Sequence, residues 1–483
     1  MSGAFLALNG YRVGILEKHH QIGGNLQTFT RKGVKFNSAM HFVGAMDPGQ
    51  ILHQVFSYLG IRDKTGLAKL NPEAYEEIYI GDRHYAHANG MEAYGERLLS
   101  YFPGEKEAIS AYLKKIKDVW NSTNVLNLQD FRNHIDADTQ YTLENAHKFI
   151  DRLTGDRDMK ALLGVSSALY AGVPDKSPLL THAIINYHYI QSAYKFSGGS
   201  DLMAGALEGV IRDHGGRIHR NCEVTGFKYE DREICSALTG EGGEVSAKSF
   251  ISNIHPANTV KLVEPGRFRK AYVNRITELE NTIGSYCVYI RFKKRKFRNI
   301  DANVFISLTR EVWSAGLYDK LPWPSACILY TSPDPEDKTY AESMVASAFM
   351  KMDELEAWKD SRVEKRGEEY KDFKAAKAEK LIDMVSSRFP DVRAGMEDYY
   401  TATPLTFRDY TGIPEGSVYG ILKDCNNPRR SYISPYTRIP NLFLTGQNSG
   451  VGLHGVLGVT VSSLFTCSNF LDIGELLDNI RND

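Results

Sequence analysis

The sequence predicts an α/β protein built around a discontinuous, Rossmann-like nucleotide-binding domain. Three stretches that lie far apart in the chain carry this prediction: residues 3–17, 198–224 and 441–471. Each of them joins a short β-prone run to a helix-prone run through glycines, which is the pattern of a parallel sheet covered by helices. The expected domain consists of residues 1–50, 196–260 and 407–483, and the two intervening stretches, 51–195 and 261–406, are expected to form a second, α+β domain for a substrate.

The first stretch ends in an acidic residue. Residues 3–9 favour a short helix that stops at Asn9-Gly10, and residues 11–16 favour a buried strand that Glu17 follows directly. In a βαβ dinucleotide unit, the acidic residue at the tip of the second strand accepts hydrogen bonds from a ribose diol. The glycine pair Gly23-Gly24 comes next and lets the backbone approach a ligand closely.

The other two stretches repeat the alternation of glycine, helix and strand. Glycine pairs flank a predicted helix over residues 201–214, which leads into a predicted strand over residues 217–224. Residues 35–44 favour a further strand, and residues 244–254 favour a hairpin arm that ends at the loop residue His255 before Pro256. Near the C-terminus, a predicted strand over residues 441–446 is followed by a glycine-rich loop and a helix from His454 to about residue 471. A helix N-terminus offers free N–H groups to an anion or a carbonyl. Gly450, Gly452 and Gly455 spell G-x-G-x-x-G, but no second strand with an acidic tip follows, so they do not indicate a nicotinamide site.

These residues resemble a family of FAD-dependent oxidoreductases that includes phytoene desaturases, carotenoid isomerases, retinol saturases and, more distantly, amine oxidases. The resemblance rests on Glu17, on IGGNLQT at 22–28, and on LFLTGQN at 442–448 with HGVLG at 454–458. It covers nearly the whole chain and is strongest at both ends. Gln447 departs from the acidic residue that many members carry there, and no G-x-G-x-x-G precedes Gly3. We therefore expect roughly 15–25 further residues, with a strand and a glycine turn, ahead of Met1.

The resemblance implies FAD as the cofactor and a set of residues that hold it. The implied cofactor-binding residues are Glu17, Gly23, Gly24, Leu26, Val224, Gly446, Gln447, Gly455 and Val456. The backbone of Val224 would pair with the adenine edge, and the N–H groups near Gly455 would face the ribityl–pyrophosphate or the flavin O2 carbonyl. The implied chemistry is hydride transfer at flavin N5 to or from a carbon of a long conjugated substrate, with His454 as the candidate catalytic proton donor.

Two other functions stay open at this stage. A flavin amine oxidase on the same scaffold would need two aromatic side chains that frame the flavin, and a chain with 27 tyrosines offers many candidates. A flavin-free binding protein is the second alternative, because the glycine turn is missing. His41 could face a flavin, although a core histidine is the preferred interpretation. No motif identifies the electron donor or acceptor.

Composition excludes several classes of function. The chain has 42% hydrophobic and 24% charged residues and a net charge of −1, which is typical of a soluble globular protein and not of a nucleic-acid binder. Six scattered cysteines without a CxxC pair predict buried thiols in a reducing compartment and no metal site. No apolar run is long enough for a membrane span, and no signal peptide is visible. We expect a cytoplasmic protein, peripheral on a membrane if its substrate is a polyene.

The two intervening stretches differ in their predicted structure. Residues 51–195 predict helices at 51–59, 94–101, 105–120 and 161–170 and a hairpin at 75–85. Residues 261–406 predict strands at 285–292, 326–331 and 344–350 and a charged, solvated helical region at 353–387. The basic run at 291–298 is expected to be a solvated strand edge; contact with phosphate or a lipid headgroup is the alternative.

Overall fold

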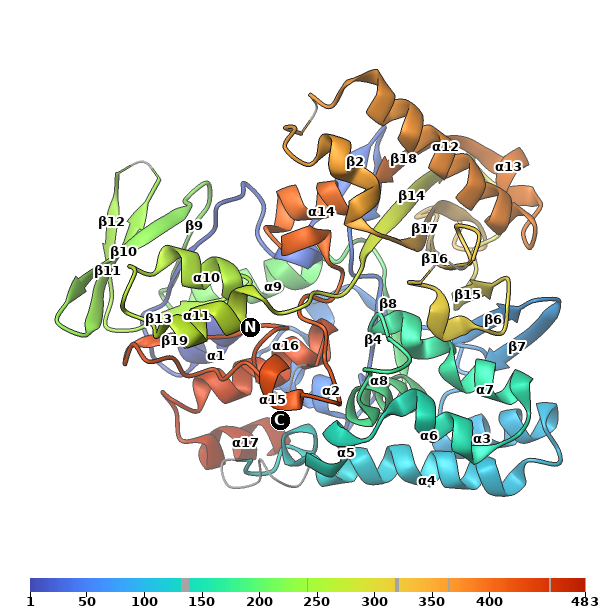
Figure 1. Ribbon diagram of the computed structural model, residues 1–483, viewed down its shortest axis with the longest axis horizontal. Coiled ribbons are helices and arrows are strands. Elements are labelled where there is room, and N and C mark those ends of the chain that lie inside the picture. The colour runs from blue at the N-terminus through green and yellow to red at the C-terminus, as the bar shows by residue number, and fades with distance from the viewer. Residues whose placement is uncertain (132–138, 241, 318–320, 364, 451–452, 483) are drawn as a thin grey trace.

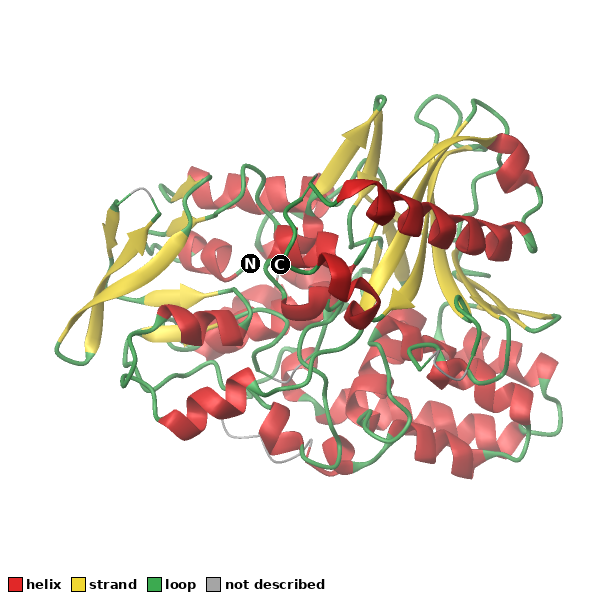
Figure 2. Cartoon of the chain, turned by 45° about the horizontal axis from the view of Figure 1, so that its top comes forward, coloured by secondary structure: helices red, strands yellow, loops and turns green. Residues whose placement is uncertain are grey.

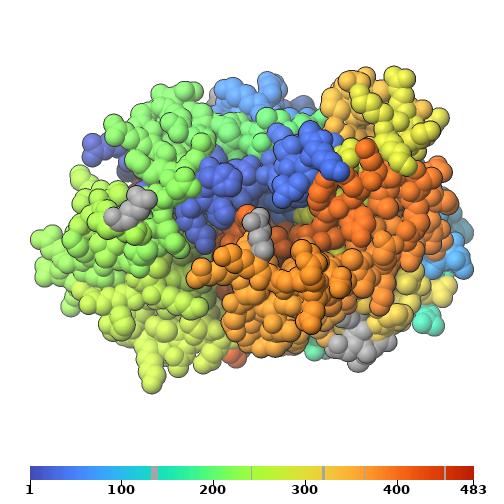
Figure 3. All heavy atoms as spheres, turned by 90° about the horizontal axis from the view of Figure 1, so that it is seen from above, coloured from blue at the N-terminus to red at the C-terminus, as the bar shows by residue number. Residues whose placement is uncertain are grey.

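The computed structural model describes residues 1–131, 139–240, 242–317, 321–363, 365–450 and 453–482. Figure 1 shows a nucleotide-binding part with short strands, a helical block and a large sheet that carries helices on one face. The predicted α/β class is confirmed. In the space-filling view, the N-terminal segment reaches the surface between the segment around residues 200–260 and the segment around residues 350–430 (Figure 3).

The nucleotide-binding part contains two parallel pairs of short strands. Strand β1 (Gly14–Leu16) pairs with β9 (Arg217–His219), and β13 (Phe250–Ser252) pairs with β19 (Leu442–Leu444). Helix α1 (Ser2–Leu8) packs against both α9 (Asp201–Asp213) and α16 (Gly455–Cys467). Within the described residues no strand pairs with the other edge of β1.

Three predicted strands of this part are divided in the structure. The strand predicted over 217–224 ends at His219, because Asn221 has a positive φ of 54° and the chain turns there. It resumes as β10 (Val224–Glu230), in an antiparallel sheet with β11 (Glu233–Thr239) and β12 (Glu244–Ser246). The arm predicted over 244–254 is likewise split between β12 and β13. The strand predicted over 35–44 becomes β3 (Val34–Asn37), which pairs with β2 (Thr28–Arg31), and β4 (Phe42–Gly44).

The remaining elements of this part are short. Strand β4 joins β8 (Ala193–Phe196) and β5 (Leu67–Lys69) in a separate three-stranded sheet. His255, which the sequence places in a loop, is the N-cap of α10 (Pro256–Leu262), where its Nδ1 accepts a hydrogen bond from the Ala257 N–H at 3.2 Å. Helices α11 (Lys270–Thr277), α14 (Pro404–Thr411), α15 (Pro428–Ser431) and α17 (Ile473–Asn482) complete it.

The helical block surrounds one buried helix. Helix α8 (Leu179–Gln191) is buried over almost its whole length and packs against α3, α4, α5 and α6. The block consists of α2 (Ile51–Tyr58), α3 (Met91–Tyr101), α4 (Lys106–Ser122), α5 (Thr139–Leu143), α6 (Ala146–Leu153), α7 (Arg157–Gly164) and α8. The helix predicted over 161–170 becomes the end of α7 and the 3₁₀ turn η4 (Val165–Leu169).

A seven-stranded mixed sheet joins the two intervening stretches. Its order is β18 (Met396–Ala402), β14 (Gly284–Phe292), β17 (Ala341–Met350), β16 (Ala326–Pro333), β15 (Asn303–Ser307), β6 (Glu76–Ile80) and β7 (Arg83–His87). The parallel pairing of β15 with β6 connects residues 303–307 to residues 76–80. Helix α12 (Gly367–Ser386), followed by α13 (Asp391–Gly395), crosses one face of the sheet (Figure 2).

The basic run at 291–298 does not lie on a sheet edge. Strand β14 runs between β17 and β18, so β18 is the edge strand on this side. Arg291 forms ion pairs with Glu397 and Asp398 on β18, and residues after Phe292 form the turn that leaves the sheet. The expectation of a solvated strand edge is therefore wrong, because a strand that the sequence did not reveal covers β14.

The described residues contain neither a membrane-spanning helix nor a cluster of metal-ligating side chains. None of the helices in these ranges is both long and apolar enough to cross a bilayer. No group of three or more His, Cys, Asp or Glu side chains in the same ranges is arranged to hold a metal ion. The six cysteines carry free thiols.

Candidate active site

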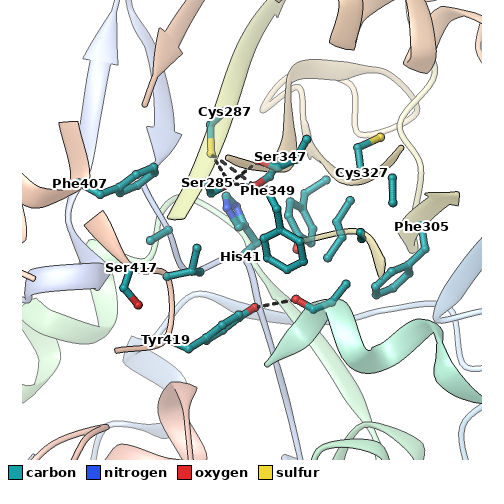
Figure 4. Close-up of a pocket in the computed structure, with 18 of the residues that line it drawn as sticks. His41, Ser285, Cys287, Phe305, Cys327, Ser347, Phe349, Phe407, Ser417 and Tyr419 are labelled. Carbon is teal, nitrogen blue, oxygen red and sulfur yellow. Dashed lines mark hydrogen bonds between the residues drawn. The ribbon is translucent and has the colours of Figure 1, made fainter. Parts of the chain in front are cut away.

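A cavity lies between the uncovered face of the large sheet and the nucleotide-binding part. Strands β14, β15, β16 and β17 form its floor. The 3₁₀ turns η4 and η5 (Val312–Ser314), helix α14, residues 417–419 and residues 38, 39 and 41 form other parts of its wall (Figure 4). The space between these residues, with the solvent at its open side included, is about 950 Å³.

The alternation of side chains along the strands separates the cavity from the core. Cys287, Ser347, Ile328 and Phe305 are register partners across four neighbouring strands, and all four line the cavity. Their neighbours in sequence point to the opposite face, where Val288 and similar residues pack in a core with α12. The strict two-residue period of a strand thus gives this sheet one core face and one ligand face.

The cavity carries no net charge at neutral pH. None of the described residues that line it is Asp, Glu, Lys or Arg. Burial lowers the pKa of His41 to about 3, so its imidazole is neutral. Burial raises the pKa of the Cys287 thiol and that of the Tyr419 hydroxyl, so both stay protonated.

His41 lies in the cavity wall. Its ring stacks on Tyr330 of β16, with the centroids 4.1 Å apart and the planes 9° from parallel. The preferred interpretation of His41 as a core histidine is therefore wrong. The residue follows β3 at a bend of the chain, and the sequence could not show which surface that bend approaches.

His454 begins α16 as its N-cap but does not line the cavity. Its side chain is 4% exposed, and its Nδ1 has no hydrogen-bond partner among the described residues. Burial, with the nearby Lys423 ammonium as a second cause, lowers its pKa to about 3. The ring of Tyr419, which does line the cavity, lies 5.4 Å from the His454 ring. The role of His454 as a proton donor stays a prediction.

The first turn of α16 can accept a ligand. No side chain caps it, so the N–H groups of Gly455 and Val456 are not bonded by the N-cap residue. Gly446 precedes this region with a φ of +99°, and its N–H donates to Ser462 Oγ at 3.0 Å. That N–H is thus already bonded within the protein, and a contact of Gly446 with the cofactor stays a prediction. Gln447 is half-buried directly after it.

The predicted adenosine contacts lie at the carboxyl end of β1. Glu17 is half-buried, and its Oε1 accepts a hydrogen bond from the His19 N–H at 2.9 Å. The Glu17 carbonyl accepts from the N–H of Cys222 at 2.8 Å, which brings the start of β10 at Val224 close by. The structure thus brings Glu17 and Val224 into one neighbourhood, as the resemblance implied.

The glycine pair lies against α9. Gly23 has a φ of +104°, and a Cβ there would lie 2.8 Å from Cβ of Ala204 on α9. Gly24 also has a positive φ, and the Leu26 carbonyl accepts a hydrogen bond from Ser200 Oγ at 3.0 Å. Only glycine fits at position 23, because a side chain would push the loop away from the start of α9.

These features fit FAD as the cofactor. An acidic residue at a strand tip suits the ribose, and an uncapped helix start with an orphaned buried imidazole nitrogen suits the polar groups of the flavin end. The residues that sequence reasoning missed are Ser285, Cys287 and Ser347 on the cavity floor. The alternation of small polar and large apolar residues at 285–288 was the available signal for a ligand-facing side of β14.

Comparison with known proteins agrees with this geometry. An all-trans-retinol 13,14-reductase from Danio rerio is 24% identical over 511 residues, which cover 96% of this chain and 83% of that protein. A 4,4'-diapophytoene desaturase from Staphylococcus haemolyticus is 20% identical over 507 residues, which cover 98% of this chain and 96% of that protein. The solved cyclohexylamine oxidase from Brevibacterium oxydans shares the fold, with a TM-score of 0.61 at 13% identity over 99% of this chain and 97% of that one.

The family comparison decides between an enzyme and a flavin-free binding protein. The profile of the family described as flavin containing amine oxidoreductase matches residues 5–463, which is nearly the whole chain. This confirms the cofactor and the class of enzyme that Glu17 and the two glycine-rich ends predicted. The chain is a FAD-dependent oxidoreductase that belongs to the flavin containing amine oxidoreductase family.

Proposed function

We propose that this enzyme transfers hydrogen to or from a carbon–carbon bond of a polyene isoprenoid, such as a retinoid or a short carotenoid. The observation that carries the proposal is the uncharged, largely apolar lining of the cavity. FAD, when bound, supplies the hydride donor or acceptor for such a reaction. The names of the retinol reductase and the desaturase among the relatives support the same substrate class.

The lining suits a conjugated hydrocarbon better than an amine. Phe305, Ile328 and Phe349 offer apolar surface along the floor, and the His41–Tyr330 stack offers a flat wall. A protonated amine in this cavity would lie without a carboxylate partner among the described lining residues, and burial of an unpaired ammonium is costly. A polyene needs from the protein a dry slot, a fixed orientation and at most one proton.

Two imidazoles are candidates for that proton. His454 is the residue proposed from the sequence, and it lies behind Tyr419. His41 is the second candidate, because it lines the cavity. Both rings are neutral at pH 7, since burial lowers the pKa of each to about 3, and a neutral imidazole still has one N–H to donate.

The test uses the purified, FAD-loaded protein with the flavin reduced chemically in the absence of oxygen. We expect all-trans-retinol or a short carotenoid to lose one double bond, seen as a blue shift of the polyene absorbance together with reoxidation of the flavin. Unreduced FAD-loaded protein is the control for bound but unreacted polyene. Bleaching of oxidised flavin by primary amines, with no response to any polyene in either direction, would favour an amine oxidase instead.

We propose further that the enzyme takes its substrate from a membrane surface, because polyenes of this kind dissolve in the bilayer. Leu308 and Leu317 are 44% and 38% exposed, and they flank η5, whose Val312 lines the cavity. Exposed leucines on either side of a turn that lines the cavity suit insertion into the headgroup region. The electron donor or acceptor is outside this proposal.

A further inference from the structure

Three small polar side chains gather at one place on the largely apolar cavity floor. Ser285 and Cys287 of β14 and Ser347 of β17 form what we call the hydroxyl–thiol cluster (Figure 4). The hydroxyl oxygens of Ser285 and Ser347 are 2.6 Å apart. Ser285 Oγ is 3.1 Å from the Ala348 carbonyl oxygen, and Cys287 Sγ is 3.5 Å from Ser347 Oγ.

The cluster has more hydrogen-bonding capacity than its members use. If Ser285 donates to the Ala348 carbonyl, Ser347 donates to Ser285 and the Cys287 thiol donates to Ser347, then the oxygens of both serines keep one free acceptor position. If Ser285 donates to Ser347 instead, the Ser347 O–H is free to donate. Ser285 and Cys287 are buried, whereas Ser347 is half-buried and faces the cavity. Ser347 is therefore the member that presents a donor or an acceptor to a ligand.

We propose that the hydroxyl–thiol cluster binds the alcohol end of the substrate, so that the enzyme acts on polyenes that carry a terminal hydroxyl group in preference to pure hydrocarbons. This inference rests on the proposed function and names the substrate class more closely. A hydroxyl group both donates and accepts, which matches the two arrangements of the cluster. The hydrogen bond would also fix how far the chain slides into the cavity, and therefore which carbon–carbon bond lies at the reacting position.

The same cluster disfavours charged ends. A carboxylate would find hydroxyl and thiol groups but no cation among the described lining residues. Burial raises the pKa of the Cys287 thiol, so the thiol adds no negative charge that could pair with an ammonium group. Burial of either ion without a partner costs more than one neutral hydrogen bond returns.

The experiment compares three probes that share one polyene chain. They are all-trans-retinol, the hydrocarbon in which a methyl group replaces its CH₂OH end, and retinoic acid. Their dissociation constants from FAD-loaded protein are measured by the change of polyene absorbance and by quenching of protein fluorescence. We expect wild-type protein to bind the alcohol about three- to tenfold more tightly than the hydrocarbon, which corresponds to one neutral hydrogen bond, and to bind the acid most weakly.

The decisive variant is Ser347→Ala, and Ser307→Ala is its matched control. Ser307 also lines the cavity floor, but its hydroxyl donates to the Thr309 carbonyl at 2.7 Å. Ser347→Ala is expected to weaken the binding of the alcohol and leave that of the hydrocarbon unchanged, so that the preference disappears. Ser307→Ala is expected to bind the alcohol more tightly than the hydrocarbon, as the wild type does.

Several outcomes would overturn the inference. Equal affinity of wild-type protein for alcohol and hydrocarbon would do so even if Ser347→Ala does not fold, and so would a preference that survives Ser347→Ala. In both cases the polyenes still bind, and the proposed function stands. Failure of all three probes to bind wild-type protein would instead remove the proposed function, and the inference with it.

Discussion

At the scale of single residues, Glu17 offers a direct test of the cofactor site. Its carboxylate stands at the carboxyl end of β1 with one oxygen bonded to the His19 N–H, which leaves the other oxygen for a ribose hydroxyl. Hydrogen bonds to a charged group are worth about 1.5–3 kcal/mol, so Glu17→Ala should weaken FAD binding by roughly ten- to a hundredfold. Glu17→Gln should weaken FAD binding less, because an amide oxygen still accepts a hydrogen bond from the ribose.

Flavin fluorescence during titration of the apoprotein with FAD gives the dissociation constant of each Glu17 variant for FAD. Glu233→Ala, at an exposed position of β11, is the control for removal of a surface carboxylate. If Glu17→Ala binds FAD with the affinity of the wild type and shows the same circular dichroism, Glu17 does not contribute to FAD binding.

Substitution of each neutral imidazole tests whether His41 or His454 donates the proton. If His41 supplies the proton, His41→Phe should keep the stacking on Tyr330 and lower the single-turnover rate by about 10²–10⁴-fold. His454→Gln should then leave the rate within severalfold of the wild type. The reverse pattern would assign the role to His454. Equal, small effects of both changes would show that the proton comes from solvent.

At the scale of elements, the start of α16 depends on one glycine. A Cβ at Gly458 would lie 2.0 Å from the carbonyl oxygen of Leu453, so any side chain must displace the loop that precedes the helix. We expect Gly458→Ala to cost about 1–3 kcal/mol of stability, as overpacking does, and to lower the FAD content of the purified protein. Gly205→Ala in α9 is the control, because a Cβ there meets nothing within 4 Å. Equal FAD content in both variants would contradict a cofactor role for the start of α16.

Elements with a local signal could be predicted, and elements defined by tertiary pairing could not. Helices α2 and α9 follow clear apolar periods between glycines, and the sequence placed both within one or two residues. Helix α8 is buried on all sides, so it shows no amphipathic period and was missed. The pairing of β15 with β6 joins residues more than two hundred positions apart, and nothing in either segment encodes that partner.

The residues of the candidate site also fall into two groups: those that a local motif predicts and those that only the tertiary structure reveals. Glu17 and Gly23 belong to a short motif that carries its own mechanism. In the structure Glu17 follows β1 and Gly23 lies against α9, and their contacts with the cofactor stay predictions. Ser347 and His41 face the cavity only because strand register and a bend turn them there. Such residues become visible once the sheet order is known, since a shift of one position in register would have turned Ser347 into the core.

At the scale of the whole molecule, buried histidines predict a loss of stability in mild acid. Burial lowers the pKa of His182 to about 3, of His188 to about 4 and of His454 to about 3. The unfolded chain takes up protons on these rings below its pKa near 6.5, and the folded protein does not. Stability is therefore full above pH 6.5 and falls as the pH drops toward 4, by about 2 kcal/mol per histidine at pH 5.

Urea unfolding, followed by tryptophan fluorescence at pH 7.5, 6 and 5, measures this loss. His182 is typical of the three, because its ring nitrogens lie 3.1 and 3.0 Å from the hydroxyls of Tyr112 and Tyr170 and have no carboxylate partner that would stabilise a charge. A midpoint that does not change between pH 7.5 and pH 5 would show that these rings are already accessible to protons in the folded protein.

The two exposed leucines that flank η5 also make a prediction about the whole enzyme at a membrane. Leu308 and Leu317 lie on either side of η5, and burial of their exposed surface in a bilayer would contribute on the order of 1 kcal/mol each. The double change Leu308→Ser with Leu317→Ser should therefore lower the partition coefficient onto phosphatidylcholine vesicles by roughly thirtyfold. Leu143→Ser, at a leucine of α5 that is 54% exposed, is the matched control and should leave partitioning unchanged. Vesicle sedimentation measures the bound fraction, and turnover of a polyene in vesicles against turnover in detergent shows whether the contact serves substrate entry. Equal partitioning of the double variant and the wild type would show that Leu308 and Leu317 do not contact the membrane.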